Sequence, residues 1–286
     1  QMTCYVFPGQ GSQKVGMGEE LFNQFPEYVK KSNNILGYDI KKLCLEDPEN
    51  KLGKTNYTQP ALYIVSALAY LNQKSNQESS PSYLAGHSLG EYTALFAAKS
   101  FDFETGLKLV QKRGDLMSKA SGGGMAAIIG LNKEDINDVI QNNNLNSIQI
   151  ANLNEPNQTV ISGEKESILS SQKIFEEAGA KRYIPLAVSG AFHSKFMDNA
   201  KNEFKEFLET VDIKRPSLPV IANVTARPIE DNVKELLIQQ IVSSVRWVET
   251  IEYVLQQNET NFEEIGPGKV LSGLIAKIKR SKLVNH

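Results

Sequence analysis

The segment SYLAGHSLGE (residues 82–91) joins a short apolar run to a helical pattern. The spacing predicts a strand at Ser82–Ala85 and a helix at Leu89–Lys99, with a tight turn between them. Glycines near Ser88 let the backbone turn sharply without a Cβ clash. A G-x-S-x-G pattern in this context is typical of a nucleophile elbow, whose serine oxygen projects at the helix N-terminus. The alternative is an ordinary turn in which the serine only caps the helix.

The residues on both sides of this elbow show the alternation of strands and helices that is typical of a parallel sheet with covering helices. Cys4–Pro8 reads as a short buried strand that runs into the Gly-rich turn GQGSQ. Helical patterns follow at about 17–36 and 58–74, and another, Phe103–Ser118, follows the elbow. A strand, a tight turn and a helix form the unit of an α/β fold, so we expect an α/β-hydrolase-like core.

The rhythm changes after the glycine run at 122–124. Strands and helices are then expected in the order βαββαβ, at 125–131, 133–141, 148–153, 159–162, 168–178 and 182–188. This order is that of the split ferredoxin-like motif. It predicts a small ferredoxin-like subdomain at 123–189, inserted into a large catalytic subdomain of residues 1–122 and 190–286. In the large subdomain, helices at 196–209 and 233–256, strands at 219–224 and 262–265 and a final helix complete the expected elements.

The composition excludes several classes of function. The 286 residues carry 31 Lys and Arg against 33 Asp and Glu, a balance that argues against a nucleic-acid partner. The two cysteines are too few for a disulfide framework or a zinc site, and we expect no metal. No signal peptide is recognisable, and the longest apolar-leaning run, residues 60–71, is too short to span a bilayer. We therefore expect a cytoplasmic protein with no membrane partner, and a monomer because no interface pattern stands out.

A nucleophilic serine needs a base, and the chain has only three histidines. His286 is terminal, and the side chain of His87 should diverge from that of its neighbour Ser88. His193, in the stretch SGAFHS (189–194), is left as the candidate base. A lone histidine is otherwise more often a satisfied core or surface residue.

Five stretches and one arginine together carry a family resemblance: PGQGSQ near the N-terminus, TQPAL at 58–62, GHSLGE at 86–91, Arg113, SGAFHS at 189–194 and GPGKVL at 266–271. Their order and spacing resemble the malonyl-CoA:acyl carrier protein transacylases over the whole chain. The stretch GEYTALFAAKSFDFETGLKLVQKRG is most similar to the discrete, trans-acting acyltransferases of modular polyketide synthases. The fatty-acid-synthesis enzyme is the near relative.

The resemblance implies roles for individual residues. Ser88 would be the nucleophile, His193 its base, and the N–H groups of Gln10 and Leu89 the oxyanion hole. Arg113 would pair with the malonyl carboxylate, for which the planar guanidinium fork is suited. Taken without the resemblance, Arg113 is better interpreted as a solvated helix residue and Gln10 as a turn residue.

Weaker assignments follow from the same resemblance. Phe192 would crowd the carbon that carries a branch in other extender units, and so favour malonyl groups. Gln59, Met117 and Asn154 would line the acyl or CoA cleft, although Met117 also lies on the apolar face of its helix. In the family a backbone carbonyl orients the histidine, and Ser243 is the expected carbonyl donor here.

The implied reaction is transfer of a malonyl group from malonyl-CoA to the phosphopantetheine thiol of an acyl carrier protein, through a malonyl-serine intermediate. It would supply extender units for polyketide or fatty acid synthesis, with no bound cofactor. Three alternatives are open. The first is a proofreading acyl hydrolase on the same scaffold, the second a non-catalytic docking module, and the third a lipase-like hydrolase. The basic residues at 277–282 form either a solvated helix end or a docking edge for an acidic carrier protein.

Overall fold

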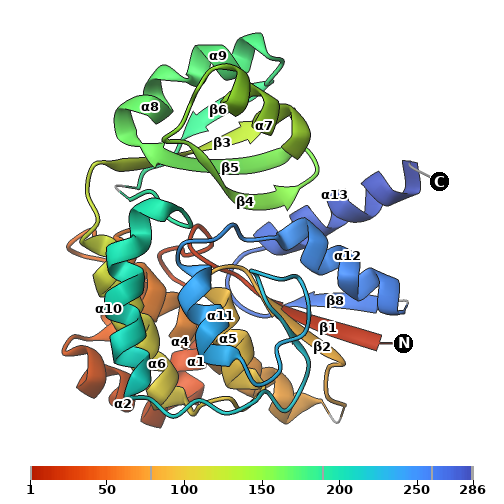
Figure 1. The fold of residues 1–286 in the computed structure, drawn as a ribbon. Coiled ribbons are helices and arrows are strands. Elements are labelled where there is room, and N and C mark those ends of the chain that lie inside the picture. The colour runs from red at the N-terminus through yellow and green to blue at the C-terminus, as the bar shows by residue number, and fades with distance from the viewer. Residues whose placement is uncertain (1, 78, 189, 259, 285–286) are drawn as a thin grey trace.

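The computed structural model describes residues 2–77, 79–188, 190–258 and 260–284. Two four-stranded sheets organise the chain, one in the lower part of Figure 1 and one at the top. The first sheet is parallel, in the order β7-β2-β1-β8. Its strands are β1 (Met2–Phe7), β2 (Tyr83–Gly86), β7 (Val220–Ile221) and β8 (Thr260–Glu264).

Helices cover both faces of the parallel sheet (Figure 1). Strand β1 shows why: Tyr5 and Phe7 pack into the core that contains α4 and α5, whereas Cys4 and Val6 pack against α12 and α13. The alternation follows from the two-residue period of a strand. The helices of this part are α1 (Glu19–Gln24), α2 (Pro26–Leu36), α3 (Ile40–Leu45), α4 (Thr55–Asn76), α5 (Gly90–Ala97), α6 (Phe103–Ser118), the 3-10 turn η1 (Lys195–Met197), α10 (Asp198–Glu209), α11 (Val233–Gln240), α12 (Trp247–Gln257) and α13 (Val270–Val284).

The second sheet, sheet B, is antiparallel in the order β4-β5-β3-β6. Its elements are β3 (Gly123–Ile129), α7 (Lys133–Asn142), β4 (Gln149–Glu155), β5 (Gln158–Glu164), α8 (Lys165–Ser170), α9 (Gln172–Glu177) and β6 (Arg182–Pro185). One face, with Ala126 and Ile128, packs under its helices, and the other, with Met125 and Ala127, joins the main core. The βαββαβ order holds, with two short helices in place of the second. The division into subdomains at 123–189 stays a prediction, and its boundary residue 189 lies outside the described residues.

Two further expected helices, in the parallel-sheet part of the chain, are each divided in the structure. The pattern at 17–36 forms two helices, because Pro26 lacks the N–H that a continuous helix needs and begins α2. The helix expected at 233–256 breaks into α11 and α12. Between them, Val245 donates its N–H to Ala151 and accepts from Leu153, so the link adds to the edge of β4. These backbone hydrogen bonds tie the parallel-sheet part of the chain to sheet B.

The structure also bears on the cysteines, on membrane-spanning helices and on metal sites. Cys4 and Cys44 are both free and buried, as expected for small apolar side chains. No helix in the described ranges is long and apolar enough to cross a membrane. Within the same ranges, no group of three or more His, Cys, Asp or Glu side chains could hold a metal ion.

Gly90 begins α5 where that helix crosses β1, and there is no room for a side chain. A Cβ at this position would overlap the carbonyl oxygen of Phe7. We expect Gly90→Ala to lower the free energy of unfolding by about 3 kcal/mol, because a backbone carbonyl cannot swing aside as a flexible side chain can. Urea denaturation measures the loss. Gly53→Ala is the matched control, since a Cβ added at Gly53 would have no described atom within 4 Å apart from its two chain neighbours. An equal loss in both variants would contradict the explanation.

Candidate active site

Ser88 lies at the turn between β2 and α5, in the left-handed region with φ 53°. Gly86 and Gly90 make this turn possible, because a Cβ on either would overlap backbone atoms. The Asn223 side chain fixes the turn from the other side: its Oδ1 accepts from Ser88 N–H at 2.8 Å, and its Nδ2 donates to Gly86 O at 2.7 Å. The turn therefore has the geometry of a nucleophile elbow, with the backbone strain held by surrounding contacts.

His193 is positioned as a base for Ser88. Its Nε2 lies 2.8 Å from Ser88 Oγ, and its Nδ1 lies 2.9 Å from the carbonyl oxygen of Gln240. Nδ1 thus donates to the carbonyl and leaves Nε2 free to accept the serine proton. The expectation that Ser243 supplies this carbonyl is wrong for the direct hydrogen bond. The backbone of Ser243 acts on the imidazole in the same direction as that of Gln240, since both raise the pKa of His193. The early end of α11 at Gln240 brings that residue's carbonyl to the imidazole instead.

The imidazole of His193 is held neutral. Burial lowers its pKa to about 3, the nearby charge of Arg113 acts in the same direction, and the bond to Gln240 opposes them. A neutral imidazole is the form that accepts a proton. The base is therefore ready over a wide range of pH.

We expect acylation of Ser88 by acetyl-CoA to show no inflection near pH 6.5, the ordinary pKa of histidine. The rate should hold from pH 8 to about pH 5, which rapid-quench measurements can follow. The same shift has a cost in stability. An unfolded histidine binds a proton below about pH 6.5 while His193 does not, so the free energy of unfolding should fall as the pH drops. An acylation rate that halves near pH 6.5 would contradict the assignment.

Arg113 is fully buried, so its interpretation as a solvated helix residue is wrong. Its Nη1 donates to Gln59 Oε1 at 2.8 Å and its Nη2 to Gln240 Oε1 at 2.8 Å. Nη2 also lies 3.3 Å from Ser88 Oγ, and the guanidinium carbon lies 5.5 Å from the ring centre of Tyr92. A cation is therefore held beside the nucleophile by neutral partners.

A cavity of about 100 Å³ opens over these groups. Polar side chains and apolar side chains both line it. Its lining residues are Gln10, Gln59, His87, Ser88, Leu89, Arg113, Met117, Met125, Asn152, Leu186, Val188, Phe192 and His193. Eight of the ten residues expected at the site, all except Asn154 and Ser243, are thus brought together.

The backbone N–H groups of Gln10 and Leu89 are available as donors. Both residues line the cavity, and neither N–H donates to an acceptor anywhere in the described parts of the chain. The side chain of Gln10 reaches Thr55 Oγ1 at 3.3 Å, which holds the loop after β1 against α4. Two free N–H groups near a serine oxygen are what an oxyanion hole requires. Their role as such a hole stays a prediction.

The weaker assignments divide. Gln59 lies between two other lining residues, because it accepts from Arg113 and its Nε2 lies 3.5 Å from Met117 Sδ. Asn154 does not line the cavity. Its Oδ1 lies 2.7 Å from Nε2 of His87, whose ring therefore turns to Asn154, and Asn152 faces the cavity instead. Irregularities in the β4–β5 pairing on both sides of this stretch disturb the regular alternation of side chains.

Three further residues around Ser88, namely Asn223, Gln240 and Glu91, were not among the expected site residues. Asn223 and Gln240 lie far along the chain in otherwise ordinary stretches, and only the fold brings them to Ser88. Gln240 Nε2 donates to Ser88 O at 2.9 Å, and its Oε1 receives Arg113. Glu91, the last residue of GHSLGE, is fully buried behind the elbow and accepts from Asn223 N at 2.7 Å.

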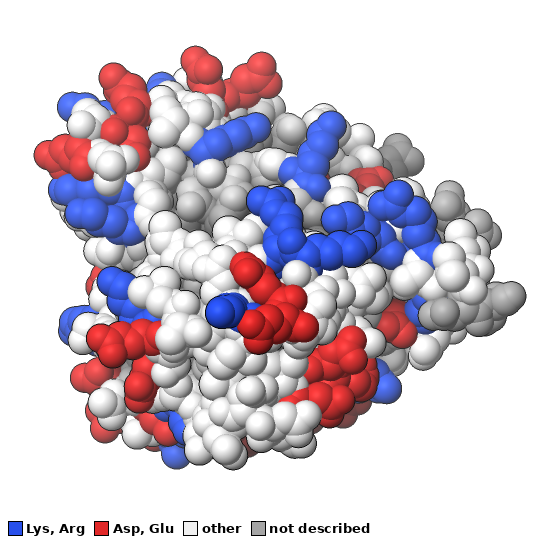
Figure 2. Space-filling view, turned by 90° about the horizontal axis from the view of Figure 1, so that it is seen from above, with Lys and Arg blue, Asp and Glu red and all other residues white. Residues whose placement is uncertain are grey.

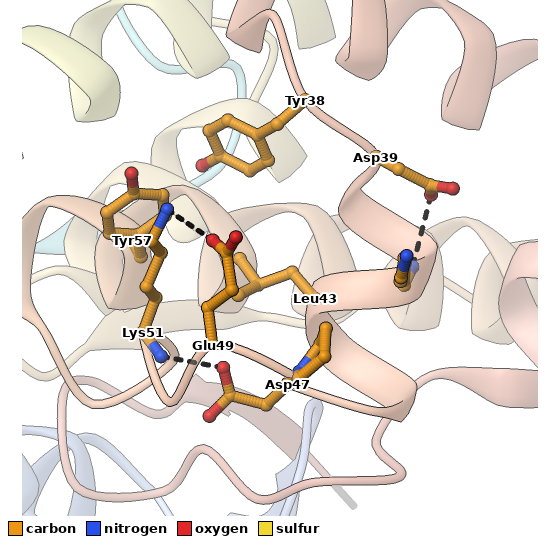
Figure 3. Close-up of a pocket in the computed structure, with 9 residues that line it drawn as sticks. Tyr38, Asp39, Leu43, Asp47, Glu49, Lys51 and Tyr57 are labelled. Atoms are coloured by element: carbon orange, nitrogen blue, oxygen red, sulfur yellow. Dashed lines mark hydrogen bonds and ion pairs between the residues drawn. The ribbon is translucent and has the colours of Figure 1, made fainter.

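A second hollow, of about 200 Å³, lies between α3 and the start of α4 (Figure 3). Its polar groups already pair with one another: Lys51 Nζ lies 2.5 Å from Glu49 and over the ring of Tyr57, and the Asp47 carboxylate accepts from the Lys51 N–H. None of its lining residues pairs a nucleophile with a base. The cavity over Ser88, in contrast, pairs a serine hydroxyl with a histidine.

Comparison with known proteins agrees with this geometry. Residues 4–282 match the family described as acyl transferase domain. Over 281 residues the chain is 52% identical to the polyketide biosynthesis malonyl CoA-acyl carrier protein transacylase PksC of Bacillus subtilis (strain 168), with 98% of each chain covered. The chain belongs to the malonyl CoA-acyl carrier protein transacylase family. The resemblance carried by the motifs is confirmed, and the chain is an acyltransferase.

Solved structures of malonyl CoA-acyl carrier protein transacylases share the fold. One from Burkholderia pseudomallei superposes with a TM-score of 0.95 at 46% identity, and the match covers 98% of both chains. A malonyl-transacylase in complex with its type II PKS acyl-carrier protein superposes with a TM-score of 0.93 at 38% identity, and the match covers 98% of this chain and 94% of that one. The expected fold class, a parallel-sheet core with a ferredoxin-like insertion, is confirmed.

Proposed function

We propose that the chain transfers a malonyl group from malonyl-CoA to the phosphopantetheine thiol of an acyl carrier protein, through a malonyl ester on Ser88. One observation carries the proposal. Ser88 Oγ lies within hydrogen-bond reach of both His193 Nε2, at 2.8 Å, and Arg113 Nη2, at 3.3 Å. A nucleophile, a base and a group that reads a carboxylate thus converge on one point.

In the first half-reaction, His193 Nε2 takes the proton of Ser88 as Oγ attacks the thioester carbonyl. The N–H groups of Gln10 and Leu89 stabilise the oxyanion of the tetrahedral intermediate. The C–S bond then breaks, and His193 returns the proton to the leaving CoA thiolate. Arg113 holds the malonyl carboxylate meanwhile, and so fixes the reacting carbonyl over the serine.

In the second half-reaction, the carrier thiol gives its proton to His193 and attacks the ester. Collapse of the intermediate transfers the malonyl group to sulfur and returns the proton to Ser88 Oγ. Transfer competes with hydrolysis, so water must be kept from the ester. The apolar walls formed by Met117, Met125 and Phe192 serve that purpose, and Phe192 also limits branching of the acyl group.

The proofreading hydrolase is the weaker interpretation. A hydrolase that strips varied acyl groups has no use for a buried cation beside its nucleophile, since burying a charge is costly. Arg113 is fully buried and reaches Ser88, which favours a substrate with a carboxylate. The identity to a polyketide biosynthesis transacylase favours polyketide over fatty acid synthesis as the pathway.

The surface charge supports an acidic carrier protein as the partner. Figure 2 shows Lys and Arg side chains gathered on the side of the molecule where α13 ends. On α13, Lys277 pairs with Glu155 and Lys282 with Glu252, whereas Lys279 and Arg280 are exposed without a carboxylate partner in the described ranges. Opposite charges of this kind would speed encounter. The monomeric state, the cytoplasmic location and the lack of a bound cofactor stay predictions.

The test is the intact mass of the protein seconds after mixing with malonyl-CoA, followed by addition of a holo carrier protein. We expect one malonyl adduct, which the carrier thiol removes as malonyl-carrier. Release of CoA and malonate with no lasting adduct would favour the hydrolase, and no reaction would favour the docking module. Acetyl-CoA is the control for the carboxylate, because it differs from malonyl-CoA only in lacking that group.

A further inference from the structure

Arg113 has neutral contacts only. Its hydrogen-bond acceptors are the carboxamides of Gln59 and Gln240 and the hydroxyl of Ser88. No carboxylate of the described residues lies within ion-pair distance of it. The electrostatic environment of the Arg113 guanidinium therefore depends on the nearest carboxyl group that it does not contact directly.

That acid is Glu91. It is fully buried and forms no ion pair with any described residue. Its Oε2 accepts from Asn223 N at 2.7 Å, and its Oε1 accepts from Gln240 Nε2 at 3.5 Å. The same Gln240 carboxamide accepts from Arg113 Nη2 through Oε1, at 2.8 Å. One carboxamide thus stands between the arginine and the glutamate, with its oxygen toward the cation and its nitrogen toward the acid.

We propose that Glu91 is a specificity-determining positioning residue, which sets through Gln240 the positive charge that Arg113 offers to a carboxylated acyl group. The inference rests on the proposed malonyl transfer and adds to it. When Glu91 is neutral, the whole charge of Arg113 is available to the malonyl carboxylate. When Glu91 is ionised, it shares that charge and repels the malonyl group, while an uncharged acyl group is affected little.

The surroundings of Glu91 determine when it ionises. Burial raises its pKa to about 8, against the opposing effects of the Asn223 N–H and the Arg113 charge. Two titratable groups interact with Glu91: Arg113 from α6, and Tyr92, which follows Glu91 on α5. Burial keeps the tyrosine neutral. Asn223 and Gln240, packed from the side of β7 and α11, carry no charge. Glu91 is therefore mostly neutral at pH 7 and loses its proton as the pH passes 8.

The experiment measures single-turnover acylation of the full chain by malonyl-CoA and by acetyl-CoA from pH 6.5 to 9.5. The malonyl carboxylate is ionised throughout, since an ordinary carboxyl pKa is about 4. We expect the malonyl-to-acetyl ratio of kcat/KM to fall about tenfold across pH 8 in the wild type. In Glu91→Gln, which fixes the neutral form, the ratio should stay at its low-pH value. A ratio that is constant in the wild type, or that falls equally in Glu91→Gln, overturns the proposal.

Two controls separate Glu91 from other causes. Glu155→Gln neutralises another buried glutamate, whose partners are Lys277 and the N–H of Asn157 and not Arg113 or Gln240, and should keep the wild-type fall of the ratio. If Glu91→Gln does not fold, the proposal is tested by measuring proton uptake at pH 8 while the wild-type protein is acylated. Malonylation should take up a fraction of a proton that acetylation does not, and no difference overturns the proposal. The adduct at pH 7 tests malonyl transfer separately: if it forms and the ratio is flat, only the role of Glu91 fails.

Discussion

Ser88→Ala should leave no mass adduct with malonyl-CoA and should lower kcat for transfer by about four to six orders of magnitude. The loss is large because every later step needs the ester on Oγ, and neither His193 nor the oxyanion donors replace a covalent intermediate. The intact mass after mixing, and the rate of malonyl-carrier formation, measure the two effects.

The matched control is Ser170→Ala, which removes the hydroxyl of an exposed serine on α8. It should acylate at the wild-type rate. The fold of Ser88→Ala should be intact, because Asn223 bonds to the backbone N–H of residue 88 and not to the hydroxyl. An adduct on a different residue of a folded Ser88→Ala protein would refute the assignment of the nucleophile.

Arg113→Ala should lose malonyl transfer selectively. We expect kcat/KM for malonyl-CoA to fall by about 10²- to 10³-fold, the usual effect of removing a buried charged partner from a carboxylate. Acetyl-CoA should be affected much less, so the preference for malonyl is lost while some acyl transfer persists. Steady-state kinetics with both donors give the ratio directly.

Two further variants sharpen this result. Arg113→Lys keeps the charge but lacks the planar fork that reaches Gln59 and Gln240 together, so it should recover only part of the preference. Arg215→Ala, at an exposed arginine, should leave kcat/KM unchanged for both malonyl-CoA and acetyl-CoA. Full malonyl selectivity in Arg113→Ala would show that another group reads the carboxylate.

Features encoded by neighbouring residues were predictable from the sequence. The elbow needs only glycines at 86 and 90 around a serine, and its strand and helix follow within a few residues. The helix at Phe103–Ser118 was predicted at its observed bounds, because its apolar period is regular and Asp102 caps its first turn. The candidate base followed from the scarcity of histidine, and the structure places it 2.8 Å from Ser88.

Features that depend on contacts between distant segments were not predictable. The break between α11 and α12 comes from the pairing of Val245 with β4, which no local pattern records. That break decides which carbonyl meets His193, so the error at Ser243 follows from it. Asn152 lines the cavity in place of the expected Asn154, at a point where the pairing of β4 is irregular. Gln240 and Asn223 act through position alone, since amide side chains are common and have no motif of their own.

The cavity over Ser88 has walls of two origins. The serine, the histidine and the arginine come from segments around the parallel sheet, whereas Met125, Asn152, Leu186 and Val188 come from sheet B and the loop after it. Natural variation in residues 123–188 can therefore change the size of acyl group admitted while the reaction itself is inherited unaltered. For an engineer, the same division means that libraries aimed at new extender units can extend from Phe192 into sheet B, where substitutions leave Ser88, His193 and Arg113 in place.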